Sequence, residues 1–269
     1  MHILMVGMGD TSRRIVPLLH AKGHHVSGIR RQPRGDEGCL VLAQDIHQPD
    51  FSALPPIDWV YVILSPDQMS ADSYQRTYVD SVQPLTQALQ SHPIQRIVFV
   101  SSTSVYGQNA GEWVDEHSPT VPTRFNGQLL RQAEQAWQQA WPNRVTVVRP
   151  SGIYSAERRR LYRMLEQGNP IAAQAWTNRI HIDDLAGFLA YLAQIPAIAA
   201  CYLASDNCPV PLDEILTALA QQQGQTARLI DPAAVSGKRI LNAALKHSGY
   251  PLKYPSWRDG YMVHSMNEV

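Results

Sequence analysis

The chain has 269 residues, of which 44% are hydrophobic and 17% are charged, a balance typical of a folded globular protein rather than a disordered one. Its 23 basic and 23 acidic side chains cancel, which excludes bulk electrostatic attraction to nucleic acid or to an anionic membrane surface. No apolar run approaches the length of a membrane span, and the three cysteines lack metal-ligand spacing, so we expect a cytoplasmic protein without a metal site.

Short runs rich in valine, isoleucine and leucine alternate with longer segments of helical spacing in the first half of the chain. The expected strands are His2–Val6, His25–Ile29, Leu40–Leu42, Ile57–Leu64, Arg96–Val100 and Val145–Val148. The expected helices between them are Ser12–Lys22, Ala71–Gln90 and Gln128–Trp141. Continuous apolar strands joined by helical crossovers are typical of a parallel sheet that is covered on both faces. The sequence therefore predicts an α/β fold with a Rossmann-type doubly wound parallel sheet.

After Arg149 the elements become shorter, and prolines separate them. We expect helices near Glu157–Gln167, Asp183–Ala193 and Leu212–Gln222, and one strand at Cys201–Ala204. The change of pattern predicts a Rossmann domain over 1–150 and a smaller C-terminal α/β lobe over 151–269, either separate or sharing strands with the first.

The first expected strand runs into Gly7-Met8-Gly9-Asp10-Thr11-Ser12 and then into a helix with an apolar face. Glycines at such a turn let backbone N–H groups approach a pyrophosphate at the positive end of the helix. Ser12 takes the place of a third glycine, and its hydroxyl can bind a phosphate or cap the helix. The alternative is an ordinary turn with Thr11 or Ser12 as the cap. Because a second strand begins about twenty residues on, we expect a dinucleotide site formed by Gly7, Gly9, Asp10, Thr11 and Ser12.

No carboxylate directly follows the second strand, where an adenosine ribose with a free 2′-hydroxyl would need one. The chain carries Arg30 and Arg31 at this point instead. A guanidinium group matches a phosphate in both geometry and charge, so the pair favours NADP over NAD as the coenzyme. The alternative is a solvated loop with basic residues.

The fifth expected strand is followed by Val100-Ser101-Ser102-Thr103-Ser104-Val105-Tyr106-Gly107, and here the sequence strongly resembles the extended short-chain dehydrogenase/reductases, the NAD-dependent epimerases and dehydratases of nucleotide sugars. The resemblance continues in the family's order with Arg149-Pro150-Ser151-Gly152-Ile153-Tyr154, 178–185, 236–245 and Gly249-Tyr250. It implies a hydride passed between a sugar carbon and nicotinamide, with the coenzyme bound in 1–150 and the substrate in 151–269. It also implies coenzyme contacts at Asp45, Ile46, Leu64, Ser65, Pro66, Ser101, Pro150 and Ile153, for which a turn at Asp45 and a strand end at Pro66 are the alternatives.

The family's usual proton relay is missing from this chain. The resemblance places Ser102 in the slot of the residue that holds the reacting oxygen, but it places Asn126 in the tyrosine slot and Leu130 in the lysine slot, between a matching Gly127 and Glu134. An amide is neither an acid nor a base near neutral pH, and leucine cannot lower a neighbour's pKa. The candidate substitutes are Tyr106, Tyr154, Tyr162 and His181. Each has a structural alternative, a packed tyrosine or a histidine at a helix start.

Arginines in the second half of the chain are candidates for the substrate site. Arg158, Arg163 and Arg179 lie in the part of the chain where the family binds a nucleotide diphosphate, and guanidinium groups bind phosphates bidentately. A solvated helix face is the alternative for the consecutive arginines. The candidate partners are a small-molecule substrate such as a nucleotide sugar and a second copy in a homodimer; we expect neither nucleic acid nor a membrane.

Three functions follow from these observations. We favour an NADP-dependent oxidoreductase or epimerase that uses a non-standard acid/base set. The second is a catalytically inactive NADP(H)-binding redox sensor or regulatory protein, which the missing tyrosine and lysine support. The third is a methyltransferase with a similar glycine loop, which leaves the serine-rich string without a purpose.

Overall fold

The computed structural model describes residues 1–168, 171–230 and 235–262, and the chain forms two compact units. Unit 1 comprises Met1–Gly107, Pro119–Arg149 and Ala186–Tyr202, and unit 2 comprises Gln108–Ser118, Pro150–Leu185 and the described residues from Leu203 onward. The chain therefore passes between the units more than once. Within the described ranges, no helix combines the length and the apolar character that crossing a bilayer requires.

A seven-stranded sheet forms the centre of unit 1, in the order β12-β7-β5-β4-β1-β2-β3. Its strands are β1 His2–Val6, β2 His25–Arg30, β3 Leu40–Ala43, β4 Trp59–Val62, β5 Arg96–Val100, β7 Val145–Pro150 and β12 Cys201–Ala204. Neighbours from β3 to β7 pair in parallel, with Val6 opposite Ile29 of β2 and Val62 of β4. The doubly wound parallel sheet predicted from the sequence is confirmed. The strand order reverses between β1 and β4, the position at which such sheets bind ligands.

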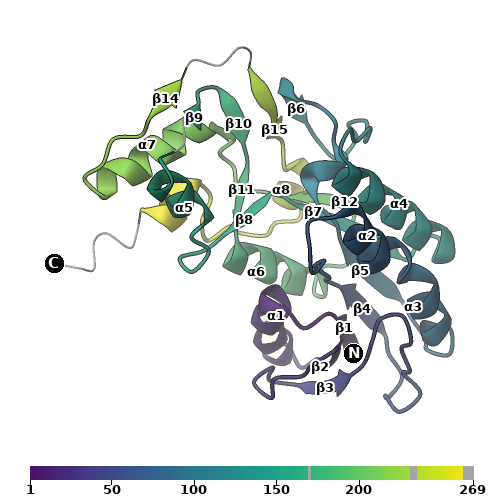
Figure 1. Ribbon diagram of the computed structural model, residues 1–269. Helices are drawn as coiled ribbons and strands as arrows, with labels where there is room; N and C mark the ends of the chain where they lie inside the picture. The colour runs from purple at the N-terminus through teal and green to yellow at the C-terminus, as the bar shows by residue number, and fades with distance from the viewer. Residues whose placement is uncertain (169–170, 231–234, 263–269) are drawn as a thin grey trace. The chain divides into compact units, whose positions relative to one another are not determined.

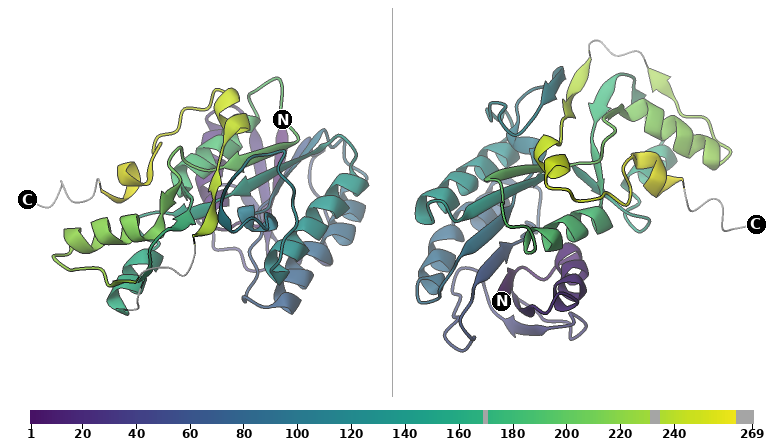
Figure 2. Two further views of the ribbon diagram at one scale, coloured as in Figure 1. Left: turned by 90° about the horizontal axis from the view of Figure 1, so that it is seen from above. Right: turned by 180° about the vertical axis from the view of Figure 1, so that it is seen from behind.

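Helices cover both faces of this sheet, so every residue of β1 and β7 is buried. Figures 1 and 2 show α1 Asp10–His20 and the end of α6 Ile182–Leu192 over one face, and α2 Ala71–Tyr74, α3 Val82–Leu89 and α4 Phe125–Ala140 side by side over the other. The single helix expected over 71–90 is wrong, because a π-helical turn, η1 Gln75–Val79, follows α2 and precedes α3. Apolar spacing does not distinguish this wider turn from an α-helix.

Unit 2 consists of short strands and short helices. Its strands form a sheet in the order β13-β10-β15-β6 and two separate pairs, β11 with β8 and β14 with β9. Their bounds are β6 Ala110–Val114, β8 Gly152–Tyr154, β9 Ile171–Ala172, β10 Ala175–Thr177, β11 Arg179–His181, β13 Val210–Pro211, β14 Leu229–Ile230 and β15 Ser236–Ile240. Its remaining helices are α5 Arg160–Glu166, α7 Leu212–Gln222, α8 Ala243–His247 and α9 Trp257–Tyr261. The helices expected near α5 and α7 are confirmed.

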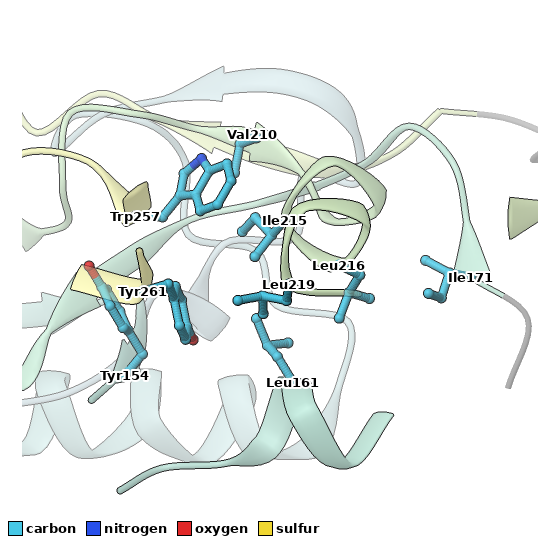
Figure 3. Packing of buried hydrophobic residues seen from close by; sticks show 9 residues of the cluster. All are labelled: Tyr154, Leu161, Ile171, Val210, Ile215, Leu216, Leu219, Trp257 and Tyr261. Atoms are coloured by element: carbon cyan, nitrogen blue, oxygen red, sulfur yellow. The ribbon is translucent and has the colours of Figure 1, made fainter. Parts of the chain in front are cut away.

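An apolar cluster holds the elements of unit 2 together. Figure 3 shows Leu161 of α5, Leu219 of α7 and Trp257 of α9 directed toward one another. Tyr154 of β8 stacks on Tyr261, with ring centroids 4.4 Å apart. This packing fixes β8, and β11 pairs with β8 in parallel, so the cluster also positions the side chains of β11.

Candidate functional site

The loop between β1 and α1 has a backbone that its glycines make possible. Gly7 has a φ of +96°, in the left-handed region, and a Cβ at this position would collide with the carbonyl group of Ile63. Gly9 stands at the N-cap of α1, and apart from its neighbours along the chain no described residue has an atom within 4 Å of the place that its Cβ would take. The N-terminus of α1 therefore faces open space at Gly9.

Ser12 stabilises this loop with a hydrogen bond from its side chain. Its hydroxyl donates a 2.6 Å hydrogen bond to the carbonyl oxygen of Gly7, and the residue is fully buried. No described side chain caps α1, so the expectation that Thr11 or Ser12 caps the helix is wrong. The hydroxyl that fills the third glycine slot stabilises the turn itself.

A pocket of about 600 Å³ opens at the carboxyl ends of β1 to β4, within unit 1. This volume falls in the range of small-molecule and cofactor sites. The predicted coenzyme contacts that line it are Gly7, Gly9, Arg30, Arg31, Asp45, Ile46, Leu64 and Ser65. Those outside the lining are Asp10, Thr11, Ser12, Pro66 and Ser101 in unit 1, and Pro150 and Ile153 in unit 2. The structure thus brings together residues that follow four separate strands.

The pocket also contains residues that the sequence did not identify. They are Met8, Ile29, Gln32, Gln44, His47, Ile63, Asp67, Ser73, Arg76 and Thr77. Arg76 and Thr77 belong to the π-helical turn η1, a type of turn that is frequent at functional sites. Asp67 comes directly after Pro66, shortly past the end of β4, and this position could have marked it as a pocket residue.

Arg30 is tied to the glycine loop. Its Nη1 donates to the carbonyl oxygen of Met8 at 3.1 Å and lies 3.4 Å from a carboxylate oxygen of Glu37. The backbone N–H groups of Arg34 and Gly35 donate to the same buried carboxylate at 2.6 and 2.7 Å. The Arg34 N–H above all, with the nearby guanidinium, holds the pKa of Glu37 below its usual value. The Met8 carbonyl oxygen therefore holds the Arg30 side chain in place at the pocket, and the Glu37 carboxylate offsets part of its positive charge.

Arg31 forms a two-pronged ion pair with Asp67. Its Nη1 and Nη2 donate to the two carboxylate oxygens at 2.8 and 2.6 Å. The Arg31 hydrogen bonds lower the pKa of Asp67, and the same bonds raise the pKa of Arg31. The two side chains are 66% and 64% exposed, and ion pairs with such exposure add little stability because water and salt screen them. Arg31 can therefore exchange this partner for another anion.

The serine string forms a tight turn beside the start of α4. The Ser102 Oγ caps the turn η2 Thr103–Val105 by accepting the N–H of Ser104 at 3.1 Å, so its own O–H remains a donor. Gly127 packs so closely that a Cβ would collide with the Ser104 carbonyl group. Asn126 is half-buried beside it, and Leu130 is 3% exposed, in the core of unit 1. The lysine slot is thus a core position.

Tyr106 belongs to a buried network. Arg149 donates to both carboxylate oxygens of Glu134, at 2.9 and 2.7 Å, and to the hydroxyl oxygen of Tyr106 at 2.6 Å. Burial raises the pKa of Tyr106, although the neighbouring guanidinium opposes the shift. This arrangement positions α4 against β7 and gives Tyr106 a structural role.

The candidate substitutes in unit 2 are also engaged in packing. Burial raises the pKa of Tyr154, which stacks on Tyr261, and the pKa of Tyr162, over whose ring Arg159 lies. The Nδ1 of His181 accepts the N–H of Asp183 at 3.2 Å, at the start of α6. These contacts agree with the structural alternative for each residue.

Arg179 differs from the other predicted substrate residues in its burial. Arg158 and Arg163 are exposed, whereas Arg179 is 9% exposed on β11 and its Nε makes no hydrogen bond to any described residue. The backbone N–H of Asp206 donates to the Arg179 carbonyl oxygen, and the buried Asp206 Oδ2 likewise lacks a described partner. Burial raises the pKa of Asp206 to about 8. The positive charge of Arg179 opposes this shift, so the two buried groups act on each other.

No metal centre emerges from the described parts of the chain, where no three His, Cys, Asp or Glu side chains are grouped to hold an ion.

Comparisons with known proteins identify the family and the fold of the chain. The model of the NAD(P)H-binding family matches residues 7–196. Protein YeeZ of Escherichia coli K12 is 28% identical over 206 residues, which cover 72% of this chain and 73% of YeeZ. A solved structure from Methylobacillus flagellatus that carries the name NAD-dependent epimerase/dehydratase is 34% identical, with a TM-score of 0.82 over 99% of both chains. MoeE5, solved with UDP-glucuronic acid and NAD, has the same fold, with 19% identity and a TM-score of 0.80 over 97% of this chain and 96% of MoeE5.

Proposed function

We propose, from the premise that the chain belongs to the NAD(P)H-binding family and has an epimerase/dehydratase-like fold, that it is an NADP-dependent oxidoreductase or epimerase acting on a nucleotide sugar. The open space at Gly9, beside the N-terminus of α1, is the observation that carries the coenzyme assignment. Backbone N–H groups at a helix N-terminus bind phosphate groups, and a pyrophosphate fits this position. When bound, a nicotinamide coenzyme donates or accepts a hydride.

Two features favour NADP over NAD. Arg30, the last residue of β2, and Arg31, the next residue, both line the pocket, and the residues that directly follow β2 include no carboxylate for a 2′-hydroxyl. Arg31 holds only an exposed partner, and a phosphate offers the same two-pronged geometry with more charge. Arg30 adds a second cation whose position the Met8 carbonyl oxygen fixes.

Arg179 supports an anionic substrate held by the 151–269 part of the chain. A buried guanidinium that lacks a hydrogen-bond partner at Nε is costly, and a phosphate would supply that partner. The positive charge of Arg160 also acts on Arg179, so the site is more cationic than Arg179 alone would make it. A nucleotide sugar such as the one named for MoeE5 presents the required diphosphate.

Ser102 is the residue for which we propose direct contact with the substrate. Its O–H can donate to the reacting oxygen while the Ser104 N–H fixes its Oγ. Leu130 lies in the core, so the lysine of the usual pair has no counterpart at that position. Any proton transfer must then use a group other than the usual tyrosine and lysine pair. This is what we mean by a non-standard acid/base set.

The test incubates the protein with NADP and a panel of UDP-sugars and measures two products: net NADPH, which an oxidoreductase forms, and the epimer of each sugar, which an epimerase forms while it returns the hydride and leaves no net NADPH. The Ser102→Ala variant is expected to lower kcat by about 100-fold and to leave the Kd for NADPH unchanged. Ser104→Ala is the matched control, because its buried hydroxyl has no hydrogen-bond partner among the described residues. Full activity in Ser102→Ala excludes the role of Ser102. Coenzyme binding without turnover of any sugar contradicts the enzyme and favours the redox sensor.

A further inference from the structure

The ion pair between Arg31 and Asp67 joins two sides of the pocket. Arg31 follows β2 and Asp67 follows β4, and β1 lies between these strands in the sheet. Both residues line the pocket. The Asp67 carboxylate occupies Nη1 and Nη2 of Arg31, at 2.8 and 2.6 Å. These two nitrogen atoms form the fork with which an arginine binds a phosphate bidentately.

The exposure of this pair argues against a structural purpose. Buried ion pairs hold elements together, but at 66% and 64% exposure this pair contributes little to stability. The neighbouring Arg76, which also lines the pocket, places a second positive charge near the Asp67 carboxylate. Asp67 therefore has another cation beside it when Arg31 turns to a ligand.

Arg30 provides the contrast within the same pocket. It donates to the Met8 carbonyl oxygen, and its acid, Glu37, is buried and also bound by two backbone N–H groups. A ligand cannot displace Glu37 without breaking those bonds. Of the two described acids that pair with Arg30 and Arg31, Asp67 is therefore the one that a ligand can replace.

We infer that Asp67 is a specificity-determining residue that competes with the coenzyme's 2′-phosphate for Arg31 and so sets the preference between NADP and NAD. The inference rests on the proposed NADP binding. A 2′-phosphate must displace the Asp67 carboxylate and then lies close to its negative charge. NAD has no such group, and it binds with the ion pair intact. Asp67 thus weakens NADP binding and leaves NAD binding nearly unchanged.

The experiment compares Asp67→Asn with the wild type by titration calorimetry, using 2′,5′-ADP and 5′-ADP as probes. The amide keeps the shape of the side chain and removes its charge. The affinity for 2′,5′-ADP is expected to rise about threefold to tenfold, and the affinity for 5′-ADP to change less than about twofold. Glu214→Gln is the matched control, because Glu214 forms an exposed 2.6 Å pair with Arg258 in unit 2. This control should change neither affinity.

A double variant tests whether the effect passes through Arg31. In an Arg31→Ala background, Asp67→Asn should no longer favour 2′,5′-ADP. An equal gain for both probes, or no gain for either, overturns the inference even if the wild type prefers the 2′-phosphate. A wild type that prefers 5′-ADP, together with an Asp67→Asn shift toward 2′,5′-ADP, supports Asp67 and contradicts the proposed coenzyme. A wild type that binds neither probe overturns both proposals.

Discussion

Arg31 in unit 1 and Arg179 in unit 2 are both candidates for holding a phosphate, but they differ in their exposure to solvent. Arg31 is 66% exposed and paired with an acid that is equally exposed. Arg179 is 9% exposed, its Nε has no described partner, and burial raises the pKa of the neighbouring Asp206 to about 8.

The difference shows how exposure decides what an arginine can do. An exposed pair exchanges its partner at small cost, so it can discriminate between ligands and adds little to stability. A buried guanidinium with an unsatisfied N–H costs stability, and an anion that accepts that hydrogen bond would remove part of the cost. The predictions below test each half of this contrast, beginning with the largest expected effect.

Gly7→Ala tests the pocket of unit 1, which Arg31 also lines. The left-handed φ of +96° and the collision with the Ile63 carbonyl group should lower the free energy of unfolding by about 1–3 kcal/mol and weaken NADPH binding more than about 100-fold. Denaturant unfolding and fluorescence titration measure the two effects. Gly23→Ala is the control, because its φ of +77° imposes similar strain, with no described atom within 4 Å of the new Cβ. If NADPH binds as tightly to Gly7→Ala as to the Gly23→Ala control, the glycine loop does not hold the coenzyme.

Arg179→Met tests the buried half of the comparison. Removing a buried guanidinium whose Nε has no described hydrogen-bond partner should leave the free energy of unfolding level or higher, while UDP binding weakens about 100-fold and NADPH binding is unchanged. Calorimetric titration with UDP and chemical unfolding provide the measurements. A loss of stability with full UDP affinity means that Arg179 is a structural cation.

Asp206 predicts a pH dependence of stability. Because burial raises the pKa of its carboxyl group from 3.8 to about 8, the folded chain binds more protons than the unfolded chain between these values. The free energy of unfolding should therefore fall as the pH rises from about 4 to about 8, by at most about 1.4 kcal/mol per pH unit from this group. Arg179, Asp184 and Asp259 are the charges that act on it. Asp206→Asn should flatten the profile, and parallel profiles for variant and wild type contradict the assignment.

Arg31→Ala tests the exposed arginine and should give the smallest effect of these variants. NADPH binding should weaken about tenfold and NADH binding should not change, because only the 2′-phosphate needs this guanidinium. The free energy of unfolding should stay within about 0.5 kcal/mol of the wild type. Competition titrations measure both affinities. Equal losses for NADPH and NADH contradict a role in discrimination.

The sequence predicted the parts of the fold that local pattern determines. The apolar runs of β1 and β7 are buried on both faces, so composition alone marked them as central strands. The glycine loop was also predictable, since Gly7 needs a backbone that few residues adopt. The short strands of unit 2 were missed, because elements such as β9 and β13 have no periodicity and pair with distant segments.

The candidate site was only partly predictable for a similar reason. Arg30 and Arg31 follow a strand and were found, whereas Arg76 reaches the pocket from a π-helical turn that reads as a continuous helix. The burial of Arg179 and the exposure of Arg158 depend on packing in unit 2, which local sequence does not encode.

Titration calorimetry of the purified chain with NADPH and NADH is the most direct test of the coenzyme pocket. We predict one binding event for each nucleotide, tighter for NADPH, and loss of both in Gly7→Ala. The absence of any binding heat for both nucleotides, in their oxidised and reduced forms, would contradict the assignment of this pocket.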